Sequence, residues 1–214
     1  MSQLRELKPA RRVDWDAIYR EGTPPWENGA PAAELVRLVE DRILRPARTL
    51  DIGCGTGADA IYLAKRGFEM MAVDNSPTAV ERARVRAEQD DALLRFVMAD
   101  AFEFGQTAGQ FELVYDVGLY HFIRLTDLEK FLDLLWRVTA PGSYYFTIAG
   151  RKNCAAHGGP PPVTKREIHQ ELGRLFEPVE LRECHLGSPC VSQGYPAWSC
   201  LMRRPALSKM PARA

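Results

Sequence analysis

The stretch "RTLDIGCGTGADA", from Arg48 to Ala60, runs from a short apolar strand pattern through three closely spaced glycines into a helical pattern. Glycines let a backbone adopt conformations that other residues rarely take, and they leave room for a ligand beside the main chain. An acid, Asp51, stands two residues before the first glycine. The stretch therefore predicts a strand, a ligand-binding loop and the start of a helix.

Strand and helix patterns alternate on both sides of this loop. Strands are predicted at "EMMAVD", "LLRFVMAD", "FELVYDVG" and "SYYFTIAG", with helices at "ADAIYLAKRG", "NSPTAVERARVRAEQDD" and "DLEKFLDLLWRVTAPG" between them. Helices are also predicted at "DWDAIYREG", "APAAELVRLVEDRIL" and "TKREIHQELGRLF", and strands at "PVELRECHLG" and "PAWSCLMRR". Such alternation predicts a doubly wound, Rossmann-like α/β sheet that binds its ligand at the carboxyl ends of the strands.

Composition narrows the class of protein. The 214 residues suffice for one domain, and the 28 basic and 28 acidic residues cancel, which argues against a nucleic-acid partner. No apolar run has the length of a signal peptide or membrane helix, so we expect a cytoplasmic protein. The odd number of cysteines, five, has no compact spacing, so we expect no disulfides. Two sets of candidate metal ligands, Cys154 with His157 and Cys184 and His185 with Cys190, lack a CxxC pair and any recognised zinc spacing, so we expect no metal.

Two cofactors compete for the glycine loop. Gly53, Gly55 and Ala58 satisfy G-x-G-x-x-A, and Asp74 follows where an acid binds ribose, as in dinucleotide sites. A pyrophosphate would be repelled by Asp51, however, and the chain has no Tyr-x-x-x-Lys pair. S-adenosylmethionine carries an ammonium and a sulfonium, which acids attract. We therefore expect S-adenosylmethionine, with a nicotinamide-dependent oxidoreductase as an alternative.

The predicted cofactor contacts follow the strand ends. Asp74 would accept hydrogen bonds from the ribose diol, and Asp100 with the amide of Ala101 would contact adenine. The glycines would let the methionine part pass close to the backbone. The full predicted set is Trp26, Asp51, Gly53, Cys54, Gly55, Asp74, Asn75, Asp100, Ala101 and Asp116.

The stretch "LDIGCGTGADAIYLAKRGFEMMAVDNSPTAVERAR" resembles the cofactor-binding half of class I S-adenosylmethionine-dependent methyltransferases. The resemblance in order of elements continues to "AWSCLMRR". It implies a seven-stranded, mostly parallel sheet with helices on both faces, whose last strand is antiparallel and inserted between the fifth and sixth. It also implies one domain: a helical cap over residues 1–45, a cofactor half over 46–150, a substrate half over 151–204 and a tail over 205–214.

A narrower resemblance lies in "WDAIYREGTPPWENGAPAAELVRLV", which is similar to the N-terminal segment of the thiopurine and tellurite-resistance methyltransferases. In that group the tryptophan after proline, here Trp26, lies across the cofactor. "YDVGLYHF" matches a D-x-G-x-x-H stretch that faces the methyl group. The acceptors of the group range from thiols and inorganic anions to aromatic heterocycles, so the resemblance leaves the acceptor atom (S, N or O) open.

The acceptor side is predicted from the strands that follow. His121, just beyond the fourth strand, is the candidate general base, because its ordinary pKa lies near working pH, and Asp116 would orient it. Tyr115, Tyr120, His121 and Trp198 would face a small-molecule acceptor. A noncatalytic cofactor-binding module is a second alternative. We expect a monomer or a weak homodimer.

Overall fold

The structure, a computed structural model, describes residues 13–24, 26–151, 159–187 and 194–206. Cys154, His157 and Cys190 lie outside these residues. Within them, no helix is both long enough and apolar enough to cross a membrane.

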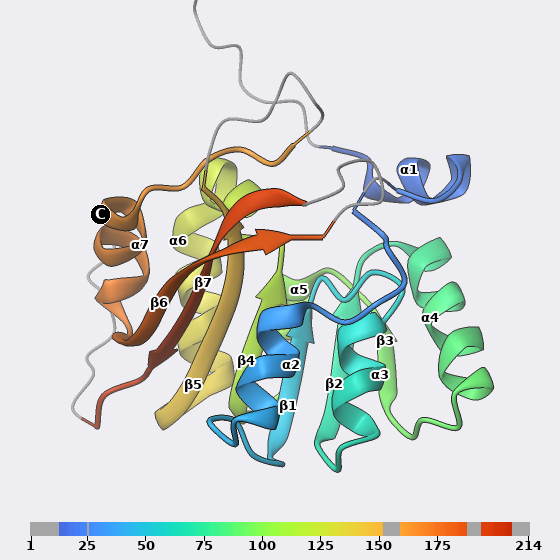
Figure 1. Cartoon of the computed structure of the whole chain (residues 1–214), viewed down its shortest axis with the longest axis horizontal. Coiled ribbons are helices and arrows are strands. Elements are labelled where there is room, and N and C mark those ends of the chain that lie inside the picture. The colour runs from blue at the N-terminus through green and yellow to red at the C-terminus, as the bar shows by residue number, and fades with distance from the viewer. Residues whose placement is uncertain (1–12, 25, 152–158, 188–193, 207–214) are drawn as a thin grey trace, which may run out of the picture.

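Seven strands form one sheet in the order β3-β2-β1-β4-β5-β7-β6 (Figure 1). The strands are β1 Arg48–Ile52, β2 Glu69–Asp74, β3 Arg95–Met98, β4 Phe111–Val117, β5 Thr139–Gly150, β6 Glu177–Leu186 and β7 Tyr195–Arg203. Strands β1 to β5 pair in parallel, whereas β7 lies antiparallel between β5 and β6. The predicted sheet, including its inserted last strand, is confirmed.

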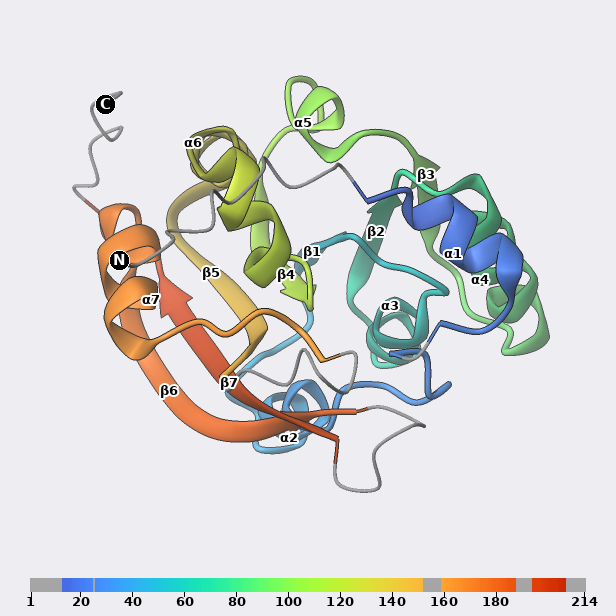
Figure 2. The ribbon, with the colours of Figure 1, turned by 90° about the horizontal axis from the view of Figure 1, so that it is seen from above.

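Helices cover both faces of the sheet, as predicted (Figures 1 and 2). Their bounds are α1 Trp15–Glu21, α2 Ala33–Glu40, α3 Ala58–Ala64, α4 Pro77–Gln89, α5 Ala101–Phe104, α6 Tyr120–Val138 and α7 Lys165–Glu171, which a 3-10 turn, Leu172–Arg174, extends. Fully buried Leu35, Leu38 and Leu63 of α2 and α3 pack in one core. The other core joins α6 and α7 to the opposite face through Phe131, Leu135 and Ile168.

The helix after β4 starts earlier than the sequence predicts. The pattern placed its start at Asp127, but α6 begins at Tyr120, and Asp127 marks a break with φ −136° and ψ 33°. The first turn has no capping side chain at Leu119. Asp116 instead accepts hydrogen bonds from the Leu119 and Tyr120 amides, at 3.0 and 2.9 Å, across the turn at Gly118. His121 therefore lies in the first turn of a helix.

The N-terminal segment divides into two parts. Residues 13–24 and 26–29, which we call the strap, run beside α4 and reach the glycine loop (Figure 2). Helix α2, which the sequence grouped with the cap, packs into the core on the sheet face instead. Its two fully buried leucines explain this placement, because their apolar surface is removed from water only against the sheet.

Candidate functional site

The glycine loop, residues 53–57, folds back over the end of β2. The amides of Gly53 and Cys54 both donate to the Val73 carbonyl, at 2.8 and 3.1 Å. Gly53, Gly55 and Gly57 have φ values of +75°, +53° and +79°. At Gly55 a Cβ would lie 2.7 Å from the Tyr19 hydroxyl oxygen, so this position requires glycine for space as well as conformation.

Asp74, at the end of β2, holds the loop and the next helix together. Its two carboxylate oxygens accept from the Gly55 and Ser76 amides, each at 2.9 Å. Burial raises the pKa of this carboxyl, and the backbone donors oppose that rise. Each oxygen accepts one of these bonds and has a further lone pair, so the carboxylate is fixed in place with acceptor capacity left for a diol.

The strap contributes a second acid to the loop. Glu27 accepts from the Thr56 hydroxyl and, at 3.4 Å, from the Thr56 amide. The Tyr19 hydroxyl donates to Glu27 and accepts from the indole N–H of Trp26, at 3.4 and 3.3 Å. Trp26 is half-buried. The structure thus brings Trp26 to the glycine loop region, together with Tyr19 and Glu27, which the sequence did not single out.

Polar contacts with α4 hold the strap in position. Asp16 accepts from the Ser76 hydroxyl at 2.7 Å and from the Thr78 amide at 3.0 Å. Arg82 donates to the backbone carbonyls of Gly22 and Tyr19, both at 2.8 Å. These bonds join segments about sixty residues apart, so the strap is fastened to the helix that follows Asp74.

Acids dominate the charge around the glycine loop. Asp51, Asp59, Asp74 and Glu27 lie close enough to affect one another, and Arg86 is the cation that acts on Asp59. Burial, and to a smaller extent the charge of Glu27, raise the pKa of Asp59 to about 6. The Ala32 N–H, which donates to Asp59 at 2.7 Å, acts in the opposite direction and lowers this pKa. A cationic ligand would relieve this repulsion.

Asp51 and Tyr115 contact each other inside the sheet. They are paired in the β1–β4 register, and the Tyr115 hydroxyl donates to Asp51 at 2.8 Å. Asp51 is 3% exposed and Tyr115 is 0% exposed. Burial raises the pKa of Asp51 well above its ordinary value. The negative charge that disfavours a pyrophosphate therefore lies on Asp74, Asp59 and Glu27 more than on Asp51. Tyr115 lies in the core instead of facing an acceptor.

Asp116 and Tyr120 also point inward. Besides capping α6, Asp116 accepts from the Tyr145 hydroxyl at 2.5 Å and from the Thr147 hydroxyl at 3.2 Å. Burial raises its pKa to about 6. Tyr120 is fully buried, and its hydroxyl donates to Glu171 at 2.7 Å. Both side chains have their polar groups satisfied within the fold, where they stabilise the α6 turn, and their predicted contacts with the cofactor and the acceptor stay predictions.

His121 is neutral and positioned by the backbone. Its Nδ1 accepts from the Gly150 amide at 3.2 Å, and burial lowers its pKa to about 3. Because a neutral imidazole has one N–H, this assigns the proton to Nε2. His121 can thus donate a hydrogen bond from Nε2, whereas the general-base role that the sequence predicted needs a free nitrogen lone pair.

Aromatic rings connect the strap with His121. Trp15 packs edge-on against Trp26 and Phe122, with ring centroids 5.7 and 5.1 Å apart. The Phe122 ring lies 4.6 Å from the His121 ring. The predicted cofactor residue Trp26 and the predicted catalytic residue His121 are therefore joined by continuous ring contacts.

The remaining predicted residues lie at the same edge of the sheet. Asp100 caps α5 by accepting from the Phe102 amide at 2.8 Å, which places Ala101 at the first position of that helix. Asn75 is exposed, and Cys54 is half-buried in the loop. Trp198 is 7% exposed, and its indole N–H donates to the Val163 carbonyl at 2.9 Å. Trp198 is thus mainly a packing residue in this structure.

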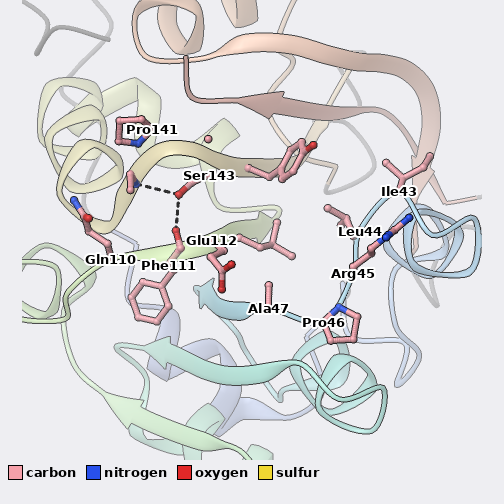
Figure 3. Close-up of a pocket in the computed structure, with 14 residues that line it drawn as sticks. Ile43, Leu44, Arg45, Pro46, Ala47, Gln110, Phe111, Glu112, Pro141 and Ser143 are labelled. Atoms are coloured by element: carbon pink, nitrogen blue, oxygen red, sulfur yellow. Dashed lines mark hydrogen bonds between the residues drawn. The ribbon is translucent and has the colours of Figure 1, made fainter. Parts of the chain in front are cut away.

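A separate hollow of about 600 Å³ lies at the opposite edge (Figure 3). It is lined by residues 43–47 before β1, by residue 110 and the first three residues of β4, and by residues 140–144 in the first part of β5. Its Ser143 hydroxyl accepts from the Ala140 amide at 3.0 Å and donates to the Phe111 carbonyl at 2.7 Å. Parallel α/β sheets bind ligands at the other ends of their strands, where the glycine loop lies.

Comparison with known proteins agrees with this geometry. The methyltransferase domain family matches residues 49–142. A 2-heptyl-1-hydroxyquinolin-4(1H)-one methyltransferase of Mycobacteroides abscessus is 32% identical over 156 residues, 72% of this chain and 68% of that protein. A probable thiol methyltransferase 2 of Arabidopsis thaliana is 32% identical over 170 residues, 78% of this chain and 75% of that protein.

A solved structure shares the fold over nearly the whole chain. It comes from work on the conversion of a disulfide bond into a thioacetal group during echinomycin biosynthesis, and it is 27% identical, with a TM-score of 0.78. The match covers 90% of this chain and 92% of that one. The chain belongs to the class I S-adenosylmethionine-dependent methyltransferases. It is an enzyme that takes its methyl group from S-adenosylmethionine and transfers it to a small molecule.

Proposed function

We propose that S-adenosylmethionine lies across the glycine loop with its ribose on Asp74, its adenine beside Asp100 and Ala101, and its methionine end under Trp26. The observation that carries this proposal is the Asp74 carboxylate, which two backbone amides fix at the end of β2. A carboxylate held in this way binds two adjacent hydroxyls with charge-assisted hydrogen bonds.

The residues at this edge fit a cationic cofactor. When bound, S-adenosylmethionine supplies an electrophilic methyl group on a positively charged sulfur. Asp74 and Glu27 give the edge a negative potential, and the amides of the loop lie beside them. Glu27 belongs to the strap, so the strap would add charge to the site as well as cover it.

On the acceptor side, the main contribution of the protein is to position the acceptor. Methyl transfer requires the nucleophile to lie in line with the methyl–sulfur bond, and orientation of this kind supplies about 7–11 kcal/mol. We assign His121 the role of a neutral hydrogen-bond donor that orients the acceptor through Nε2. Its Nδ1 contact with Gly150 holds the ring in that orientation.

The acceptor we propose is a small organic thiol, hydroxyl or ring nitrogen. The relatives in the comparisons are named for a hydroxyquinolone and a thiol. The balance of 28 basic and 28 acidic residues supports a small acceptor over nucleic acid. We further propose that the protein acts as a monomer or a weak homodimer.

The test is calorimetric titration with S-adenosylhomocysteine and, in parallel, with NADH. Micromolar binding of S-adenosylhomocysteine without NADH binding is the expected result. NADH binding alone would overturn the proposed cofactor site. A screen of thiols, halides, phenols and azoles for methyl transfer then identifies the acceptor, and turnover of any of them excludes a noncatalytic binding module.

A further inference from the structure

Two cations flank the indole of Trp198. The guanidinium carbon of Arg151 lies 5.3 Å from the ring centroid, and the Lys165 Nζ lies 4.8 Å from it. Arg151 directly follows β5, and Lys165 is the first residue of α7. Three segments far apart in the sequence thus bring two positive charges to one aromatic side chain. The resemblance to known families did not single out either cation.

The strand register places this group at the carboxyl ends of the parallel strands, the edge that holds the glycine loop and that we call the reacting edge. Trp198 pairs with Ala149 of β5 and with Glu183 of β6. Side chains two residues apart on an extended chain share a face, so Arg151 lies on the same face as Ala149 and Trp198. Because β5 runs parallel to β4, its end lies at the same edge as the ends of the cofactor-side strands.

Arg151 is also next to the contact that holds His121. The Gly150 amide donates to His121 Nδ1, and Gly150 is the neighbour of Arg151 in the chain. The Arg151 amide in turn donates to the Pro196 carbonyl at 2.8 Å, which fixes the backbone there. An acceptor that contacts His121 would therefore lie beside the segment that carries Arg151.

The charges that face this group leave a positive excess. Arg151 pairs with Glu183 at 3.2 Å, and the Glu183 side chain is 60% exposed. Glu167 of α7 is engaged by Arg124 and by its own helix cap. Among the described residues, Lys165 has no carboxylate within 4.0 Å. His121 is neutral, so the sum over Arg151, Lys165 and Glu183 is one positive charge.

Arg151 also offers a hydrogen-bond donor at its Nε. Its Nε is buried and has no hydrogen-bond partner among the described residues. A buried guanidinium N–H without an acceptor is costly, and such groups commonly mark a place that a ligand or water completes. The donor and the positive excess both favour an anionic oxygen or sulfur.

We propose that Arg151 and Lys165 bind the methyl acceptor as its anion, so that the site selects acidic thiols and hydroxyls. This inference rests on the proposed function. The acceptor loses its proton to solvent when it binds. Its sulfur or oxygen then bonds to the methyl carbon as the carbon–sulfonium bond breaks, and that electron pair returns to the sulfur of the cofactor. The site then needs no general base, which agrees with a neutral His121.

The experiment uses 4-nitrophenol as the probe, because its anion absorbs visible light. The full chain is titrated with and without saturating S-adenosylhomocysteine, near the pH at which the free phenol is half ionised. We expect the ionisation constant of the bound phenol to rise about tenfold over that in solution, the effect of one charge-assisted contact. Arg151→Gln or Lys165→Met should remove most of that rise, and Arg151→Lys should keep part of it.

Arg203→Gln is the matched control. Arg203 lies at the other end of β7, with its guanidinium carbon 5.6 Å from the ring centroid of Tyr144. Equal losses in Arg203→Gln and Arg151→Gln, an unshifted ionisation constant, or no binding of the phenol at millimolar concentration would overturn the inference. The same samples are titrated with S-adenosylhomocysteine. Failure of that binding counts against the proposed function, whereas its success with an unresponsive phenol counts against the inference alone.

Discussion

The two halves of the reacting edge differ in charge and in construction. The half around β1 to β3 uses backbone amides and the acids Asp74 and Glu27. The half around β5 to β7 uses the cations Arg151 and Lys165 around Trp198. A positive methyl donor and a negative acceptor would each meet the opposite charge. The difference suggests that the protein brings its two substrates together by charge as well as by shape.

The largest effect is expected from removing the Asp74 carboxylate, in the half of the edge around β1 to β3. Asp74→Ala should weaken S-adenosylhomocysteine binding by about 1.5–3 kcal/mol, because hydrogen bonds to a charged group are lost and the loop amides lose their acceptor. Calorimetry measures the change. Glu69→Ala, at the exposed start of the same strand, should leave the affinity unaltered. Equal affinity in wild type and Asp74→Ala would place the ribose elsewhere.

A smaller loss is expected from filling the space under the strap. Gly55→Ala puts a Cβ 2.7 Å from the Tyr19 hydroxyl oxygen and 2.8 Å from Glu27 Oε1 at a φ of +53°. The left-handed conformation costs an alanine about 1–2 kcal/mol. We expect the substituted loop to relax out of this conformation in the free protein and to pay that cost on binding, which weakens S-adenosylhomocysteine binding about tenfold. Gly173→Ala, which meets no atom within 4 Å, is the control. An undiminished affinity would mean that the strap does not cover the bound cofactor.

The charge of Glu27 should discriminate between the two forms of the cofactor. S-adenosylmethionine has a sulfonium that S-adenosylhomocysteine lacks, so Glu27→Gln should weaken the former about threefold more than the latter, the scale of a partly exposed ion pair. Both affinities are measured by calorimetry. Glu21→Gln, at the exposed end of α1, should affect both equally. A ratio unchanged by Glu27→Gln would remove Glu27 from the electrostatics of the site.

The acceptor half should show no histidine titration. The pKa of His121 is lowered to about 3 from 6.5, so the ring stays neutral throughout the range in which histidines usually titrate. We therefore expect the pH profile of kcat/KM to follow the acceptor, without a step of its own from His121. An inflection near pH 6.5 that disappears in His121→Asn would restore the general-base role.

The cofactor half was largely predictable from the sequence because its signals are local. The glycines, Asp74 and Asp100 follow their strands within one stretch of chain, and the resemblance to class I methyltransferases supplied the strand order. The side-chain directions were not predictable. Asp51 and Tyr115 both lie in the second half of predicted strands, and only their pairing across β1 and β4 turns them toward each other.

The rest of the site depends on contacts between distant segments. Glu27 reaches Thr56 only because α4 holds the strap in place. The start of α6 was missed because its cap comes from Asp116 in the preceding strand instead of from a side chain at Leu119. Glu27, which follows Trp26, and Arg151, which directly follows a predicted strand, are visible in the sequence, but no local pattern distinguishes them from surface charges.

The strap supplies a built-in optical reporter. Of the four tryptophans, Trp15 and Trp26 lie in the strap and contact each other beside the glycine loop, whereas Trp136 and Trp198 lie in α6 and β7. Replacing the latter two with phenylalanine would confine indole emission to the strap. The time course of S-adenosylmethionine arrival and S-adenosylhomocysteine departure would then become readable by stopped-flow fluorescence, with no dye attached to the protein.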